Sequence, residues 1–357
     1  MNQQYSLRLE KIEEALGAAL PEIPGASWMA RSFTGFTGKV PLDLVKTLTI
    51  PGRDLLDRGG KRWRPLLMTL VCEALGGGDS AIPLTPLVEF PHNASLIHDD
   101  IEDNSDERRG KPAVHLLYGM DTAINAGSFL YFLPLSCVDR WEASPERKNM
   151  VYAVWAEYLR RLHLGQGMDI AWHRDFSSLP KIEEYMEMCR LKTGVLARMA
   201  AVLGVYIAGN SSGTRNSADE RDLGENLGRG AESLGVGFQI LDDVKNLTTG
   251  NPGKKRGDDI VEGKKSLPIL LYLHQQKDRV DFVSRCFSAA REKGARADEV
   301  EELISALEGA GVIEEARQHG LGLIDAGEKV FGDDLAKAIP EENEARKLLS
   351  GFVGLLL

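Results

Sequence analysis

The carboxylates of one short stretch, LIHDDIEDNSDERRGKPAVH at residues 96–115, are the first groups in the chain that could do chemistry. Six acids lie within nine residues there, and two arginines follow directly. Asp99 and Asp103 are four residues apart, so they share one face if the stretch is helical. Carboxylates on an apolar helix are unfavourable unless a cation pairs with them. Two carboxylates at this spacing can hold Mg²⁺ and still leave coordination sites for water and phosphate oxygens.

A second acidic stretch, GFQILDDVKN at residues 237–246, repeats this pattern. Asp242 and Asp243 form the second carboxylate pair, and Gln239 precedes them by about one helical turn. Arginine and lysine, the side chains that bind phosphate, are clustered near both stretches. These cations are Lys61, Arg62, Arg64, Arg108, Arg109, Lys254, Lys255, Arg256, Lys264 and Lys265. One acidic helix end alone is more often solvated surface, but two of them with clustered cations predict a site for a magnesium-bound diphosphate or triphosphate.

Helices must position these groups, because apolar residues recur at spacings of three and four and strict alternation is scarce. Stretches rich in Gly, Pro and Ser at 76–80, 210–217 and 248–259 separate the helical segments. The sequence therefore predicts an all-α, single-domain bundle. Helices are expected near 5–20, 40–57, 62–76, 84–104, 120–139, 147–173, 181–209, 219–247, 266–275, 278–291, 297–309, 312–331 and 341–355.

Composition narrows the classes of function. The net charge of -10 over 357 residues argues against nucleic-acid binding, which requires a basic face. The four cysteines form no CxxC pair, so neither a zinc site nor a disulfide framework is indicated, and a reducing, cytoplasmic compartment is expected. The longest uncharged apolar run, 126–138, is shorter than the ~18 residues of a spanning helix, so no transmembrane segment is expected. The apolar tail at 348–357 is expected to dock as a last helix, with a membrane-surface contact as the alternative.

Several motifs occur in a characteristic order and spacing. They are GGKRWRP at 59–65, HNASLIHDDIED at 92–103, RRGKPAVH at 108–115, GQGMD at 165–169, LKTG at 191–194, GFQILDDVKN at 237–246 and GKKRGDDIVEGKKSLP at 253–268. The ordered set resembles the trans-isoprenyl diphosphate synthases, the polyprenyl synthetase family, over about residues 40–345. The resemblance implies an N-terminal helix and connecting segment at 1–39, followed by a catalytic domain at 40–357.

The resemblance also implies an all-α bundle around a deep central cavity, usually as a homodimer. Such an enzyme elongates prenyl chains with Mg²⁺, and three ions are expected once substrate is bound. An allylic diphosphate ionises, its carbocation attacks the double bond of isopentenyl diphosphate, and a proton leaves. The expected small-molecule partners are therefore isopentenyl diphosphate and an allylic prenyl diphosphate.

Carried over position by position, the resemblance assigns roles to the charged and polar residues of the motifs. The catalytic set is Asp99, Asp103, Lys192, Asp242 and Lys254, in which the three aspartates are the expected Mg²⁺ ligands. The allylic diphosphate is expected to meet Arg108, Lys192 and Lys254, with Lys264, Thr193 and Gln239 nearby. The isopentenyl diphosphate pocket is expected to contain Lys61, Arg64, His92 and Arg109.

The resemblance further implies that product length depends on the residues four and five before the first aspartate motif, which form the floor of the cavity. These are Ser95 and Ala94, and both are small. Small residues permit growth to C20 or somewhat beyond, whereas aromatic residues would stop it near C15.

Two positions depart from the family pattern. Asn246 stands where the second motif usually has a third aspartate, and Ser128 stands where an aspartate is common. Two alternatives stay open beside the chain-elongating enzyme, the first because of these departures and the second because it shares the fold and the metal chemistry. One is a non-catalytic partner subunit of another synthase, and the other is a class I terpene cyclase. The complete isopentenyl diphosphate pocket counts against the cyclase.

Overall fold

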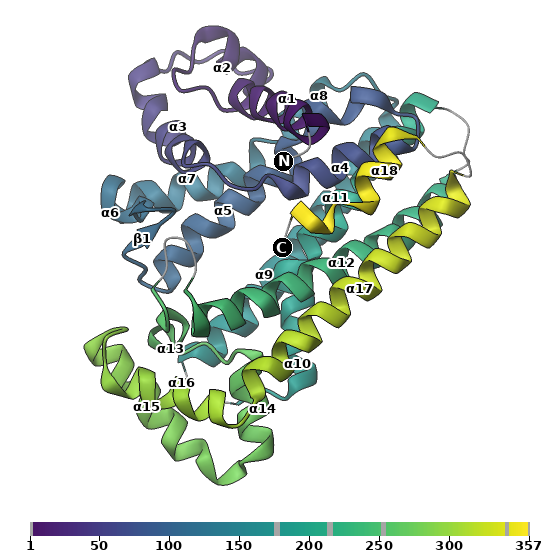
Figure 1. Ribbon diagram of the computed structural model, residues 1–357. Helices are drawn as coiled ribbons and strands as arrows, with labels where there is room; N and C mark the ends of the chain where they lie inside the picture. The colour runs from purple at the N-terminus through teal and green to yellow at the C-terminus, as the bar shows by residue number, and fades with distance from the viewer. Residues whose placement is uncertain (1–2, 175–178, 213–216, 251–254, 340–342, 356–357) are drawn as a thin grey trace. The chain divides into compact units, whose positions relative to one another are not determined.

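The computed structural model describes residues 3–174, 179–212, 217–250, 255–339 and 343–355, and these are helical almost throughout (Figure 1). The predicted all-α fold is confirmed. The helices of the N-terminal half are α1 (Gln3–Ala19), α2 (Ala26–Ser32), α3 (Leu42–Asp57), α4 (Trp63–Ala74), α5 (Pro86–Glu102), α6 (Val114–Tyr118), α7 (Met120–Phe132), α8 (Leu135–Arg140) and α9 (Pro145–Arg174). Those of the C-terminal half are α10 (Ile182–Cys189), α11 (Val195–Ser212), α12 (Ser217–Thr248), α13 (Asp258–Glu262), α14 (Leu267–Gln275), α15 (Val280–Lys293), α16 (Asp298–Gly309), α17 (Val312–Ala338) and α18 (Glu344–Ser350).

Short irregular elements join these helices. A two-stranded hairpin, β1 (Glu107–Arg108) and β2 (Lys111–Pro112), follows α5. Short 3₁₀ helices cover Gly78–Leu84, Lys277–Arg279 and Val353–Leu355. The expected helix at 181–209 is interrupted by a π-helical turn over Arg190–Gly194. The expected helix at 120–139 is two helices, because Pro134 starts a new one.

The chain divides into two compact units. The first comprises Met1–Leu159, Leu196–Arg229 and Val330–Leu357, and the second comprises Arg160–Val195 and Gly230–Lys329. The predicted boundary at residue 40 stays a prediction.

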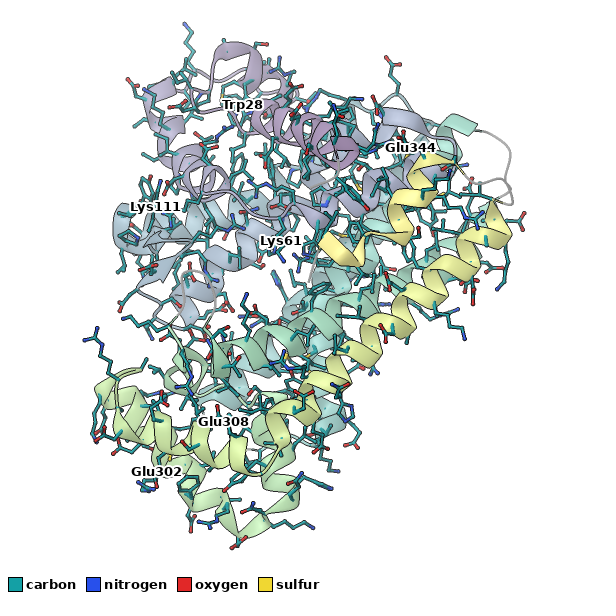
Figure 2. The ribbon with its side chains drawn as sticks, in the orientation of Figure 1. Trp28, Lys61, Lys111, Glu302, Glu308 and Glu344 are labelled. Carbon is teal, nitrogen blue, oxygen red and sulfur yellow. The ribbon has the colours of Figure 1, made fainter. Side chains whose placement is uncertain are left out.

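In the first unit, α5 packs against α7, α3, α4 and α1, and α18 lies along α4 (Figure 1). Ala345, Leu348 and Leu349 are buried on α18, so the C-terminal helix docks as expected. Arg8 of α1 pairs with residues of α4 and α18, because its guanidinium lies 2.6 Å from Glu73 and 3.6 Å from Glu344. Glu344 is labelled in Figure 2.

In the second unit, α10, α14, α15 and α16 enclose a core with the later turns of α12. The largest fully buried side chains of this core include Tyr185 and Phe287. Gly237 lets α12 approach α17 closely, since an added Cβ would lie 2.6 Å from the carbonyl oxygen of Gly320.

One helical stretch, Ile182–Gly209, is long and apolar enough to cross a membrane by length and composition. However, 78% of its most apolar window is buried inside the structure, as in a core helix of a globular protein. The stretch is therefore weak evidence for a membrane span.

Candidate active site

The C-terminal end of α5 presents Asp99 and Asp103 one turn apart. Asp103 is the C-cap of the helix, and its backbone N–H donates to the carbonyl of Asp99 at 2.8 Å. Acids at this end face the negative pole of the helix dipole, so they require a cation nearby. Arg108 supplies it, because its guanidinium lies 3.6 Å from Asp99.

Asp100 orients Arg108. The Arg108 Nε–H donates to the Asp100 carboxylate at 2.8 Å, and a second guanidinium nitrogen donates to the same oxygen. The Asp100 side chain is fully buried, so this charged pair is screened little by water. Sequence reasoning assigned no role to Asp100, because Asp99 and Asp103 lie on the expected metal-binding face of the helix and Asp100 lies about 100° away from Asp99.

The hairpin after α5 places Arg108 and Arg109. Arg109 and Gly110 form its two-residue turn, and both have positive φ, at +53° and +75°. This is the backbone that a type I′ hairpin turn requires. The buried side chain of Arg58, the C-cap residue of α3, anchors the hairpin by donating to the carbonyls of Arg108 at 3.0 Å and Pro112 at 2.9 Å.

Arg64, His92 and Arg109, three residues of the predicted isopentenyl diphosphate pocket, lie within electrostatic reach of one another. Burial lowers the pKa of Arg64 and of Arg109 to about 10, and each also feels the negative charge of Glu89. Burial lowers the pKa of His92 well below its ordinary value, and the charges of Arg64 and Arg109 lower it further. At neutral pH the two arginines are therefore cationic and His92 is a neutral hydrogen-bonding group.

The donors of this cluster are directed by the backbone and by aromatic contact. Arg109 donates to the carbonyl of Leu55 at 3.0 Å and to Asn93 Oδ1 at 3.4 Å. Arg64 lies 4.4 Å above the Trp63 ring, and its buried Nε has no hydrogen-bond partner among the described residues. Lys61, which lies in the GGKRWRP motif with Arg64, is exposed (Figure 2).

Arg62, the neighbour of Lys61, is a structural group. Its side chain is 2% exposed, and it donates to Glu13 at 2.7 Å, to Glu89 at 2.9 Å and to the carbonyl of Leu56. Glu89 also accepts from Asn93 Nδ2 at 2.9 Å. Sequence reasoning missed Glu89, whose position within the apolar start of α5 is the signal that could have marked it as a buried counter-ion.

In the second unit, the π-helical turn carries Lys192 and Thr193. Lys192 Nζ lies 2.6 Å from Asp169 of the GQGMD motif on α9. A Cβ at Gly165 would lie 2.5 Å from the backbone nitrogen of Lys192, so this glycine lets α9 pack directly against the π-helical turn. The GQGMD motif therefore positions Lys192 in two ways, since Gly165 packs against its backbone and Asp169 pairs with its ammonium group.

Gln239, Asp242 and Asp243 lie on α12 of the same unit. Thr193 Oγ1 donates to Gln239 Oε1 at 2.8 Å, so two predicted allylic contacts are in direct hydrogen bond. Asp242 is exposed and Asp243 is buried. Burial and the charge of Asp259 raise the pKa of Asp243 to about 7, against the hydrogen bonds from Tyr185 and Gln239.

Lys264 follows α13 in the same unit. Its Nζ lies 2.5 Å from Glu262 and 4.0 Å from Asp259. The predicted phosphate contact Lys254 lies outside the described residues.

Comparison with known proteins identifies the family of the chain. Residues 45–307 match the sequence pattern of the polyprenyl synthetase family. The chain belongs to this family. It is 32% identical to the geranylgeranyl diphosphate synthase of Methanosarcina mazei over 309 residues, which cover 85% of this chain and 88% of that protein. It is 33% identical to the geranylfarnesyl diphosphate synthase of Natronomonas pharaonis over 340 residues, which cover 89% and 92%.

A solved structure gives the same result. The geranylgeranyl pyrophosphate synthetase from Pyrococcus horikoshii superimposes with a TM-score of 0.78 at 28% identity, covering 99% of this chain and 96% of that one. The predicted polyprenyl synthetase family, and with it the class of trans-prenyltransferases, is confirmed.

The metal expected of a polyprenyl synthetase can be tested against the donors present. Asp99 and Asp103 belong to the first unit and Asp242 to the second. Within the described residues no group of three or more His, Cys, Asp or Glu side chains is close enough to hold a metal ion unaided. The carboxylates of Asp99 and Asp103, one turn apart beside Arg108, suit Mg²⁺, because Mg²⁺ combines one or two protein carboxylates with substrate phosphates and water.

The predicted product-length residues lie within α5. Ala94 is fully buried, and Ser95 is half-buried with its hydroxyl donating to the carbonyl of His92 at 2.8 Å. Their helix packs against α7, where Tyr131 is buried and Phe132 is exposed.

Proposed function

We propose that this polyprenyl synthetase condenses isopentenyl diphosphate with an allylic diphosphate, in a 1′–4 elongation that yields C20 or somewhat longer products. The observation that carries the proposal is the layout of α5. His92, beside Arg64 and Arg109, precedes Asp99, beside Arg108, by seven residues. Seven residues span about 10 Å of helix and return to nearly the same face. Two separate anion sites along one helix suit two diphosphate substrates.

Each group of side chains has a distinct task in this reaction. Lys61, Arg64, His92 and Arg109 would hold isopentenyl diphosphate. Arg108, Lys192, Lys254 and Lys264 would stabilise the diphosphate that leaves allylic C1, since fixed cations favour the developing charge. Thr193 and Gln239 would help to hold the allylic diphosphate. The C1–O bond breaks, a C–C bond forms to isopentenyl diphosphate, and the proton lost is taken up by the departing diphosphate.

Asp99, Asp103 and Asp242 would hold Mg²⁺, in three ions once the allylic diphosphate is present. Bound Mg²⁺ would neutralise the diphosphate and make it a better leaving group. The protein's part is to aim these carboxylates through the hydrogen-bonded end of α5 and the exposed face of α12.

Purified protein incubated with Mg²⁺, isopentenyl diphosphate and, separately, C5, C10, C15 and C20 allylic diphosphates tests the reaction. A ladder of linear products that ends at one length is expected. Cyclic hydrocarbon formed without consuming isopentenyl diphosphate would point to the cyclase. No turnover by folded protein with any primer would point to the partner subunit.

A homodimer is part of the proposal. Leu117, Met120, Ile124 and Phe132 are exposed apolar residues on α6 and one side of α7. Such a row favours association with a second copy of the chain. Light scattering should give twice the chain mass, and Ile124→Asp should give monomers while Leu44→Asp, which changes an exposed residue of α3, should not. A monomeric unaltered protein would overturn this part.

A cytoplasmic location is also proposed. All four cysteines are free and buried, which suits a reducing compartment.

A further inference from the structure

A chain of three hydrogen bonds runs from the core of the second unit to Thr193. The Tyr185 hydroxyl donates to Asp243 Oδ2 at 2.8 Å. Gln239 Nε2 donates to Asp243 Oδ1, also at 2.8 Å. Thr193 Oγ1 then donates to Gln239 Oε1 at 2.8 Å. The relay, defined as Tyr185, Asp243, Gln239 and Thr193, thus joins two residues without an assigned role to two predicted allylic contacts.

The direction of each hydrogen bond in the relay follows from its neighbour. The two Asp243 oxygens accept from different donors, Oδ2 from the Tyr185 hydroxyl and Oδ1 from the Gln239 NH₂ group. A Gln239 amide turned round would set its carbonyl oxygen against the Asp243 carboxylate. With the NH₂ group committed to Asp243, the carbonyl oxygen faces Thr193 and receives its hydroxyl hydrogen. The lone pairs of Thr193 Oγ1 consequently point away from Gln239.

The inner end of the relay is rigid, whereas its outer end is accessible. Tyr185 is 1% exposed in the core of the unit, and Asp243 is also buried. Gln239 and Thr193 are half-buried. Thr193 belongs to the π-helical turn, a local distortion that often marks functional sites. Two buried residues, Tyr185 and Asp243, thus hold two partly exposed polar residues in place. This arrangement is expected of the residues that support a binding site.

We propose that Tyr185 and Asp243 are positioning residues for the allylic site, which set the orientation of the Gln239 amide and the Thr193 hydroxyl before substrate binds. This inference rests on the proposed role of Thr193 and Gln239 in the prenyl transfer. Tyr185 acts only through Asp243, so removing its hydroxyl loosens the carboxylate and then the amide. The loss falls on catalysis at the allylic group and leaves the isopentenyl diphosphate pocket of the other unit unchanged.

A double-mutant cycle tests the relay, because residues that act through one another give non-additive effects. Tyr185→Phe, Gln239→Ala and the double variant are compared for kcat and for both KM values. Tyr185→Phe should lower kcat by about tenfold, with KM for isopentenyl diphosphate within about twofold. In the Gln239→Ala background the same change should alter kcat by less than about twofold. Tyr272→Phe, which changes a buried tyrosine of α14 outside the relay, is the matched control and should behave as the unaltered protein.

The outcomes separate the relay from the assignment beneath it. Equal losses from Tyr185→Phe in both backgrounds, or a loss of thermal stability without a change in kcat, would overturn the relay. If Gln239→Ala leaves turnover unchanged, the proposed role of Gln239 fails and the relay fails with it. If Gln239→Ala is impaired but Tyr185→Phe is not, only the relay fails. If Tyr185→Phe does not fold, Asp243→Asn replaces it in the same cycle. An asparagine at this position can also donate, so it no longer fixes the orientation of the Gln239 amide.

Discussion

The side-chain carbonyl of Asn246 accepts a hydrogen bond from the backbone N–H of Asp259 at 3.3 Å. The backbone carbonyl of Asn246 accepts a second one from Gly257 at 3.0 Å. Asn246 is fully buried, and its Nδ2 has no hydrogen-bond partner among the described residues. The residue that departs from the second aspartate motif thus joins the end of α12 to the start of α13. This geometry assigns Asn246 to structure and leaves the exposed Asp242 as the predicted metal ligand of that helix.

Restoring the family's aspartate by Asn246→Asp should therefore destabilise the protein. The new carboxylate would be buried near the Asp243 and Asp259 carboxylates, and it would cost about 1–3 kcal/mol of unfolding free energy. Urea denaturation in EDTA measures this, and Asn226→Asp on the same helix is the control. Turnover at saturating Mg²⁺ should stay within about threefold, because Asn246 contacts backbone. A large gain in turnover would show that position 246 reaches the metal.

The Lys192–Asp169 ion pair makes a second prediction. Asp169→Asn removes the charge that holds Lys192 at 2.6 Å, so the cation is no longer fixed beside the departing diphosphate. We expect kcat/KM for the allylic substrate to fall by at least about tenfold, with KM for isopentenyl diphosphate little changed. Glu187→Gln, which breaks the exposed pair with Arg190 next to the same turn, should have no such effect. Equal kinetics for the two variants would rule out a positioning role for Asp169.

The neutral state of His92 predicts a pH dependence of stability. Its pKa in the folded protein is lowered, whereas an unfolded chain protonates histidine near pH 6.5. The unfolded state therefore binds more protons below that pH, and the contribution of His92 is present above pH 6.5 and lost as the pH falls. Between pH 7.5 and 5.5 the substrate-free protein should lose about 1 kcal/mol more stability than a His92→Gln variant. Denaturant titrations at both pH values measure the difference, and parallel losses would contradict the assignment.

The helices were largely predictable because each depends on local apolar periodicity, and α5, α12, α14 and α16 begin and end close to the predicted positions. The π-helical turn and α13 were not predicted. The turn lies against Gly165 of α9, and α13 is joined to Asn246 through the Asp259 backbone, so both elements involve residues distant in sequence. The charged site residues were identified from motif spacing.

The acidic residues that pair with these site residues were not identified from the sequence, for a physical reason. Glu89 meets Arg62, Asp169 meets Lys192 and Asp243 meets Tyr185 only after packing brings separate segments together. Asp100 meets Arg108 only because the hairpin after α5 folds back. Each is an ordinary acid in the sequence, and only burial shows that its charge must be compensated.

Product length gives the last prediction, which concerns Ala94. A phenyl ring at this fully buried position of α5 would fill space beside the path of the growing chain, so Ala94→Phe should shorten the main product from C20 or longer to about C15. The ring must displace neighbours, and overpacking costs about 1–3 kcal/mol, so thermal melting accompanies the product analysis. Ser95→Ala removes the hydrogen bond to the carbonyl of His92 without adding volume, and it should leave product length unchanged. An unaltered product ladder from folded Ala94→Phe protein would place the floor of the cavity elsewhere on the helices that face α5.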